Sequence, residues 1–282
     1  MAEGKELVGV IGVGRMGLAM IKHMLRQGFQ VTVCDVNEAN LVKAREMGAT
    51  IVAKPIEMGS RASFIILAVG YDDEATEVVL GSHGVLRALK PDSIVAVSST
   101  VAPGTVKKLE AAAHGMSCDV LDAPICRGRW FADEGKLLAL FGGTDAVVAR
   151  GRKVYETFCS DISHLGEVGY GQVAKALNNL LLWVTSIGLI EAGRIAEATG
   201  IDMTKLREAL MMSSGKSQAL EDWEQTTFTW ALKDMQIVSA MSDELGLSLP
   251  LVGAIKELVK EARHIKADNP PRWTKSKNGG AN

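Results

Sequence analysis

A lysine within an apolar helical segment is the side chain of this sequence that most clearly could take part in catalysis. In "GYGQVAKALNN", Lys175 precedes Asn178 by three residues and Asn179 by four, a spacing that places the three side chains on one face of a helix. Helical lysines are usually solvated, but most other neighbours here are apolar, which indicates a cleft between domains instead. A partly desolvated lysine can accept a proton or stabilise a developing alkoxide. We therefore predict that Lys175 is catalytic.

A glycine-rich stretch near the start has the spacing of a dinucleotide-binding loop. In "VIGVGRMG", Gly12 allows a tight turn, Gly14 lets the backbone approach a pyrophosphate, and Gly17 permits close packing of helix on strand. The first N–H groups of the following helix would face the phosphates. The predicted cofactor-binding loop comprises Gly12, Val13, Gly14, Arg15, Met16 and Gly17.

An acid in the right place strengthens this interpretation of the glycines. Asp35 ends the next predicted strand, where a carboxylate can accept both ribose hydroxyls of NAD. The 2′-phosphate of NADP usually meets an arginine at this point, whereas this chain continues with Val36 and Asn37. NAD is therefore favoured over NADP, although Lys43 and Arg45 on the next predicted helix leave NADP open.

The elements that must position these residues fall into two regions. Residues 1–166 alternate short apolar runs with helical patterns, which predicts an α/β domain with a doubly wound, mostly parallel sheet. Residues 167–282 contain only helical patterns, beginning with a long interdomain helix, and Asp202 and Gly200 have the types of an N-cap and a C-terminal glycine. The final polar stretch, 266–282, is expected to be a surface extension or disordered. The predicted strands are "ELVGVIG", "FQVTVCD", "ASFIILAVG", "DSIVAVSS", "MSCDVLDAP", "KLLALFGG" and "DISHLG".

Composition argues against several classes of partner and site. A formal net charge of −2 gives no reason to expect a nucleic acid or an anionic membrane. The longest uncharged run, fifteen residues between Lys175 and Glu191, is shorter than the roughly 20 apolar residues of a membrane span. The N-terminus lacks the pattern of a signal peptide. Four dispersed cysteines and isolated histidines predict free thiols and no metal site, so we expect a cytoplasmic protein.

Five motifs in this order resemble the β-hydroxyacid dehydrogenases, the family of 3-hydroxyisobutyrate dehydrogenase and tartronate semialdehyde reductase. The resemblance covers essentially the whole chain and includes a cofactor loop, a nicotinamide-side loop, a substrate loop, a catalytic helix and a C-terminal motif. The matching segments are "GVIGVGRMGLAM", "SSTVAP", "DAPICRGRWFADEGKLLALFGG", "GYGQVAKALNN" and "LKDM". It implies a Rossmann domain, a helical second domain and an active site between them.

The resemblance also implies roles for individual residues. Lys175 would assist proton transfer at the carbinol oxygen, and Asn179 would orient the substrate or the lysine. Thr100 would lie near the nicotinamide ribose, Lys233 would reach the cofactor, and Val69 would contact it, although the family's usual Leu-Pro is replaced by "AVGYDD" there. Such enzymes are commonly oligomeric, so a homodimer or homotetramer is expected. The alternatives are a non-catalytic NAD-binding regulator and an imine reductase, of which the latter typically lacks the lysine.

The substrate loop departs from the family pattern. The family usually has Asp-Ala-Pro-Val-Ser-Gly-Gly, in which the serine and glycines bind a carboxylate, whereas this chain has Cys126, Arg127 and Gly128 as its predicted substrate-binding residues. A thiol is a weak donor, and an arginine brings a bidentate cation. Arg127 could therefore bind an extra anionic group, such as a second carboxylate, a sulfonate or a phosphonate, on a small substrate.

Two further interpretations of this loop stay open. Arg127 or Arg129 could pair with a nearby acid, Asp133 or Glu134, and only shape the loop. Alternatively, Cys126 could be a reactive thiol activated by the neighbouring cations.

Overall fold

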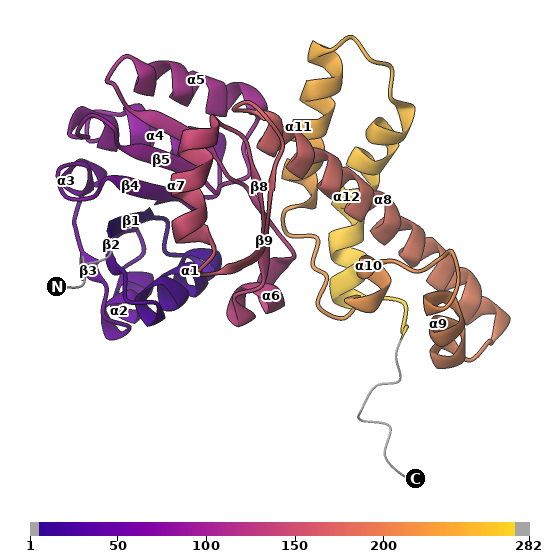
Figure 1. The fold of residues 1–282 in the computed structure, drawn as a ribbon. Helices are drawn as coiled ribbons and strands as arrows, with labels where there is room; N and C mark the ends of the chain where they lie inside the picture. Colours follow the sequence, from indigo (N-terminus) through magenta and orange to yellow (C-terminus); the bar gives the residue numbers. More distant parts are fainter. Residues whose placement is uncertain (1–5, 274–282) are drawn as a thin grey trace. The chain divides into compact units, whose positions relative to one another are not determined.

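The computed structural model describes residues 6–273 and divides the chain into two compact units, Met1–Lys175 and Ala176–Asn282 (Figure 1). The division falls inside helix α8 (Tyr170–Thr199). The boundary predicted from the sequence, after residue 166, lies just before that helix.

A parallel sheet forms the centre of the first unit. Within the described residues it has six strands in the order β3-β2-β1-β4-β5-β6, and every pair is parallel. The inner strands are buried on both faces, which explains their continuous apolar sequences. This order is that of a Rossmann fold, so the predicted fold class is confirmed. The strands are β1 (Leu7–Ile11), β2 (Gln30–Cys34), β3 (Thr50–Ile51), β4 (Phe64–Leu67), β5 (Ile94–Val97) and β6 (Asp119–Asp122).

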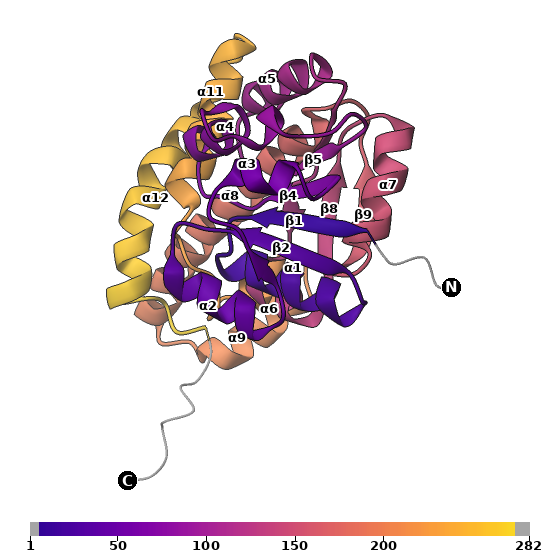
Figure 2. The same cartoon turned by 90° about the vertical axis from the view of Figure 1, so that its left-hand side faces the viewer.

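Helices cover both faces of this sheet. One core cluster joins α1, α2 and α7 to one face, and a second joins α3, α4 and α5 to the other. Figure 2 shows α1 and α2 on one side of β1 and β2, with α4 and α5 on the other. The helices are α1 (Arg15–Arg26), α2 (Glu38–Glu46), α3 (Pro55–Gly59), α4 (Asp72–Leu80), α5 (Pro103–His114) and α7 (Asp145–Tyr155), with a 3-10 turn η1 (Val85–Arg87).

A small second sheet follows the parallel one. In the described part of the chain it has three strands, with β7 (Ile125–Cys126) antiparallel to β8 (Leu137–Phe141) and β8 parallel to β9 (Cys159–His164). A bridge between Asp122 and Gly142 connects it to the end of β6. Helix α6 (Gly128–Glu134) lies between β7 and β8 in the chain. The segment that the sequence suggests as a substrate loop is therefore a short strand followed by a short helix.

The second unit is helical throughout its described part. Its core gathers Trp183 and Ile190 of α8 with aromatic and aliphatic side chains from the other helices. The predicted caps are confirmed: Asp202 accepts hydrogen bonds from the N–H groups of Thr204 and Lys205, and Gly200 has a φ of 74° just after α8. After α8 come α9 (Met203–Met211), α10 (Gln218–Glu221), α11 (Ala231–Glu244) and α12 (Pro250–Asp268).

Helix α8 alone, among residues 6–273, is long and apolar enough to cross a membrane by length and composition. Core helices of soluble proteins pass the same test. Trp183, Ile187 and Ile190 of α8 are buried in the helical core, which explains part of the apolar composition, whereas Leu177, Leu181 and Ile195 are exposed.

The segment that follows α12 packs against the helical unit at Trp273, which corrects part of the prediction for residues 266–282. Trp273 is fully buried, and its Nε1 donates to the backbone oxygen of Leu189 on α8 at 3.2 Å. The Nε1 of Trp223 donates to the Pro271 oxygen at 3.0 Å. Pro271 packs where α8 carries Gly193, since a Cβ on that glycine would lie 2.3 Å from Pro271. Burial of the Trp273 indole therefore holds this segment in place although its composition is polar. Residues 274–282 lie outside the described part.

Candidate functional site

The predicted cofactor residues of the first unit gather at one edge of the parallel sheet. The loops after β1, β4 and β5 all leave the carboxyl ends of strands that are neighbours in the sheet. The strand order reverses between β1 and β4, and open α/β sheets bind ligands at such a point. Gly12, Val69 and Thr100 therefore belong to one edge.

The three glycines of the first loop have three different environments. Gly12 has a φ of 93°, and a Cβ there would lie 2.4 Å from the Ala68 oxygen. A Cβ on Gly17 would lie 2.2 Å from the Gly12 oxygen, so this glycine lets α1 pack against the loop. Around Gly14, in contrast, a Cβ would meet no atom of residues 6–273 within 4 Å. Open space beside the start of α1 is what a bound pyrophosphate requires, so the loop fits a dinucleotide.

Asp35 is tied to the same loop. One of its carboxylate oxygens accepts a hydrogen bond from the backbone N–H of Val13, and the other accepts from Asn37 N–H at 2.7 Å. The carboxylate is half-buried. It is thus held beside the glycine loop, at the end of β2, where the sequence predicts an acceptor for ribose hydroxyls.

The loop that carries Thr100 is clamped by a glutamine from α8. The side chain of Gln172 accepts from Val101 N–H at 3.1 Å and donates to the Ser99 oxygen at 3.0 Å. The hydroxyl of Ser99 in turn accepts from Val69 N–H at 2.9 Å. Thr100 and Val69 are therefore held in one network.

Asp122 caps the helix that bears Lys175. This fully buried side chain accepts, through Oδ2, from the N–H groups of Gly169 at 2.9 Å and Gln172 at 3.1 Å. Burial raises the pKa of Asp122 to about 6, and the hydrogen bonds from Gln172, Gly169 and Gly171 work in the opposite direction. The sequence motifs did not point to Asp122 or Gln172, although an acid at the end of a buried strand was a usable signal.

Lys175 and the predicted substrate segment meet in the first unit. The Lys175 ammonium lies 3.8 Å from the sulfur of Cys126, within the range of a hydrogen bond to sulfur. Cys126 is buried and Lys175 half-buried. The four cysteines of the chain all lie in the described part and are free thiols. The folded chain thus places the predicted proton-transfer group against the residue that replaces the family's serine.

Arg127 makes contacts that the sequence did not predict. Its Nη1 lies 2.6 Å from Asp161, 2.9 Å from the Ser160 hydroxyl and 3.1 Å from the Lys136 oxygen. Its backbone has a φ of 83°, in the left-handed region that an arginine rarely adopts. Gly128 follows with a φ of 70°.

An ion pair that shapes the loop is thus present, but the expected partners of Arg127 were wrong. Asp133 instead pairs with Arg15 at 3.6 Å, and Glu134 pairs with Lys136 at 2.8 Å. The first of these links α6 to the start of α1. Arg127 instead binds Asp161, an acid on β9.

Asn179 and Lys233 belong to the second unit, so their predicted contacts with substrate and cofactor stay predictions. Asn179 is buried, and its Oδ1 accepts from the Asn178 side chain at 3.0 Å. Lys233, on α11, lies over the ring of Trp230 at 5.6 Å. The neighbouring Asp234 accepts from Trp183 Nε1 at 3.0 Å, which ties α11 to α8.

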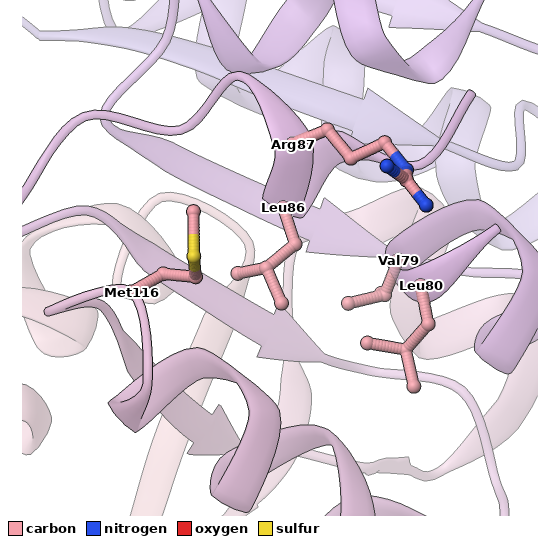
Figure 3. Close-up of a pocket in the computed structure, with 5 residues that line it drawn as sticks. All are labelled: Val79, Leu80, Leu86, Arg87 and Met116. Atoms are coloured by element: carbon pink, nitrogen blue, oxygen red, sulfur yellow. The ribbon is translucent and has the colours of Figure 1, made fainter. Parts of the chain in front are cut away.

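A shallow pocket of about 350 Å³ lies elsewhere on the first unit. Figure 3 shows its lining of mostly apolar side chains with one guanidinium: Val79, Leu80, Leu86, Arg87 and Met116. Val79 and Leu80 end α4, and Met116 precedes β6, which places the pocket at the amino-terminal edge of the sheet, opposite the glycine loop. Across residues 6–273 no group of three or more His, Cys, Asp or Glu side chains could hold a metal ion.

Comparison with known proteins adds evidence of ancestry. Residues 7–166 match a sequence family described as the NAD binding domain of 6-phosphogluconate dehydrogenase. Residues 169–270 match one described as "NAD-binding of NADP-dependent 3-hydroxyisobutyrate dehydrogenase".

Individual relatives agree with these matches. The chain is 33% identical to mitochondrial 3-hydroxyisobutyrate dehydrogenase of Mus musculus over 75% of its own length, a match that spans 63% of the mouse protein. It is 30% identical to the probable 3-hydroxyisobutyrate dehydrogenase-like 2 of Arabidopsis thaliana, over 90% of this chain and 87% of that one. A solved structure of Mycobacterium tuberculosis 3-hydroxyisobutyrate dehydrogenase with L-serine has the same fold, with a TM-score of 0.84, 22% identity and coverage of 94% and 95% of the two chains.

The glycine loop, the lysine-bearing helix and these matches lead to one conclusion. The chain belongs to the β-hydroxyacid dehydrogenase family, among relatives of the 3-hydroxyisobutyrate dehydrogenase type.

Proposed function

We propose that this chain transfers a hydride between NAD(H) and a small anionic hydroxy or oxo acid, with Lys175 assisting proton transfer at the substrate oxygen. The observation that carries the proposal is the 3.8 Å approach of the Lys175 ammonium to Cys126 in the predicted substrate segment. A lysine at this place could act on a substrate bound at that segment, which a solvated helical lysine could not. Imine reductases of this architecture typically have no such lysine, so the contact favours a hydroxyacid substrate.

The first unit offers the groups that would hold the cofactor. The open space at Gly14 and the first N–H groups of α1 suit the pyrophosphate. The carboxylate of Asp35 suits the ribose hydroxyls and would repel a 2′-phosphate, which supports NAD over NADP. Bound NAD would supply the nicotinamide that exchanges a hydride with the carbinol carbon.

The protein's own part in the reaction is positioning and proton transfer. Lys175 would take the proton of the hydroxyl during oxidation and return it during reduction. Its ammonium form would also attract an anionic substrate into the site. Asn179, one helical turn further along α8, would orient the substrate, and Lys233 would contact the cofactor, as the family resemblance implies.

The substrate class is a small 3-hydroxyacid or a close anionic analogue. The hydrogen bonds of Arg127 to Asp161, Ser160 and Lys136 support a structural role for its guanidinium. The charge that attracts the substrate is then that of Lys175. Second carboxylates, sulfonates and phosphonates remain useful members of a substrate panel, because they test this assignment directly. A cytoplasmic homodimer or homotetramer completes the proposal.

The test is a spectrophotometric panel that follows NADH formation with hydroxy acids, hydroxysulfonates and hydroxyphosphonates, repeated with NADP. Lys175→Ala is expected to lower kcat by roughly 100-fold or more while NADH binding is kept. Lys153→Ala is the matched control, because this exposed lysine lies on α7, away from the sheet edge that bears the loops.

Three results would contradict the proposal in different ways. Near-normal turnover in the Lys175→Ala variant would remove the lysine from the mechanism. NADH binding without turnover on any member of the panel would indicate a non-catalytic regulator. Reduction of cyclic imines with no activity on hydroxy acids would indicate an imine reductase.

A further inference from the structure

The acid at the end of β6 holds the start of α8. Asp122 is followed in the chain by the predicted substrate segment, and its carboxylate binds the N–H groups of Gly169 and Gln172. The first N–H groups of a helix have no acceptor within the helix itself. A carboxylate there satisfies them and interacts favourably with the helix dipole. Asp122 thus caps the N-terminus of α8, although it precedes Gly169 by 47 residues in the chain.

The helix end sits directly on the two sheets. A Cβ at Gly171 would lie 2.4 Å from the Leu140 oxygen on β8 and 2.9 Å from Asp122 Oδ2. Only a residue without a Cβ allows the first turn of α8 to approach so closely. Any displacement of Asp122 or of the first turn would therefore change how the start of α8 packs on β6 and β8.

The same helical turn also fixes a second loop. Gln172 donates its backbone N–H to Asp122 and uses its side-chain amide for the Ser99 and Val101 backbone groups. Lys175 follows one turn later on the same helix, with its ammonium against Cys126. The distance between Lys175 and the substrate segment is therefore set where α8 meets Asp122.

We propose that Asp122 is a positioning residue of the reaction, which, through the first turn of α8 and Gln172, fixes Lys175 relative to the substrate segment and the Thr100 loop. The inference rests on the proposed function of Lys175. A buried carboxylate that caps a helix carries a desolvation cost, and here Oδ1 of Asp122 has no hydrogen-bond partner among the described residues to offset it. Its presence is explained when precise placement of the helix matters more than stability.

The experiment compares Asp122→Ala, Asp122→Asn and Gly171→Ala in the full chain. Asp122→Ala is expected to lower kcat by roughly 10- to 100-fold, because misplacement by about 1 Å has effects of this size. The KM for NAD should rise by a smaller factor, because Gln172 also holds the Thr100 loop. Asp122→Asn keeps an acceptor oxygen and should restore part of kcat. Gly171→Ala keeps the carboxylate but displaces the helix, so it should lower kcat as well. Asp202→Ala is the matched control: it removes a cap with two similar N–H bonds from α9, and should leave kcat unchanged.

Two measurements do not depend on turnover. Hydrogen exchange of the amides at 169–173, and acetylation of the Lys175 amine followed by peptide mass spectrometry, should both be several-fold faster in Asp122→Asn than in the wild type. If Asp122→Ala does not fold, Asp122→Asn and Gly171→Ala decide the question.

The positioning role would be overturned if Asp122→Asn and Gly171→Ala kept the wild-type kcat and exchange rates while Lys175→Ala was inactive. The proposed function would then be left intact. An equal loss of kcat in Asp202→Ala would show that general destabilisation is the cause. If the wild type turned over no substrate, the proposed function would fail, and the exchange and acetylation rates would still decide whether Asp122 positions Lys175.

Discussion

Two glycines of the first loop should respond to the same substitution in opposite ways. At Gly14, φ is −66° and ψ is −168°, which alanine adopts readily, and a Cβ would meet no described atom within 4 Å. Reduced entropy of the unfolded chain favours alanine by about 0.4–1 kcal/mol. Alanine is a much poorer N-cap than glycine, and this loss offsets the gain by an amount of the same order. We therefore expect the free energy of unfolding of Gly14→Ala to stay within about 1 kcal/mol of the wild type.

Binding should change where stability does not. The added methyl group would occupy the space through which a pyrophosphate approaches the backbone, so the Kd for NADH should rise at least tenfold, equivalent to about 1.4 kcal/mol. Gly17→Ala should instead lower stability, because its Cβ would lie 2.2 Å from the Gly12 oxygen. Overpacking costs about 1–3 kcal/mol, and the better helix propensity of alanine returns at most about 1 kcal/mol.

The assay pairs a fluorescence titration with NADH and a urea unfolding curve for each variant. Gly14→Ala should unfold at the wild-type midpoint and bind NADH weakly, whereas Gly17→Ala should unfold at lower urea. Wild-type affinity in Gly14→Ala would refute the placement of the pyrophosphate at this loop. An unfolding midpoint as low as that of Gly17→Ala would refute the reading of open space around Gly14.

Three other predictions concern the arginine, the tryptophan and the buried acid. Arg127→Gly removes a left-handed arginine that costs about 1–2 kcal/mol and an ion pair that solvent screens strongly, because Asp161 is exposed. Urea unfolding should therefore show equal or slightly higher stability. A substrate profile moved toward simple 3-hydroxy acids would contradict the structural role of Arg127. Trp273→Ala should lower the free energy of unfolding of the helical unit by about 3–5 kcal/mol, measured by urea unfolding, with Trp273→Phe closer to the wild type because most of the buried volume is kept. Burial raises the pKa of Asp122 to about 6, above the value in the unfolded chain. The folded state therefore binds more protons between about pH 4 and 6, and the contribution of Asp122 makes the protein less stable as the pH rises through that window. The Tm should fall more steeply with pH in the wild type than in Asp122→Asn across this range, and equal slopes would contradict the assignment.

Local signals in the sequence were sufficient for much of this fold. Gly17 follows from close packing, and Asp202 and Gly200 from capping rules, because these three depend on neighbours within a few residues. At Gly12 only the turn is local, since its close approach is to the distant Ala68 oxygen. The mostly parallel sheet followed from buried strands that alternate with helices. The motif around Lys175 likewise predicted a half-buried lysine on a long helix.

Long-range contacts could not be predicted in the same way. Arg127 was matched to acids nearby in the chain, whereas its partner Asp161 is 34 residues distant and is brought close by the pairing of β8 and β9. The two-residue strand β7 exists only through its pairing with β8, so its sequence carries no alternation to detect. Trp273 lies in a polar segment, and its burial depends on a space beside Gly193 that only the folded helices create.

The ion pair at Arg127 constrains the order in which mutations could have built this loop. Asp161 alone is a partly exposed acid on β9, and it harms nothing when position 127 holds a glycine. Arginine at position 127 without Asp161 would combine a left-handed backbone with a cation that has lost its acid. The order of mutations that loses least stability therefore introduces the acid at position 161 first and the arginine at position 127 second. Reversion would follow the opposite order. Among related sequences, an arginine at position 127 should be found together with an acid at position 161, whereas the acid should also occur beside glycine.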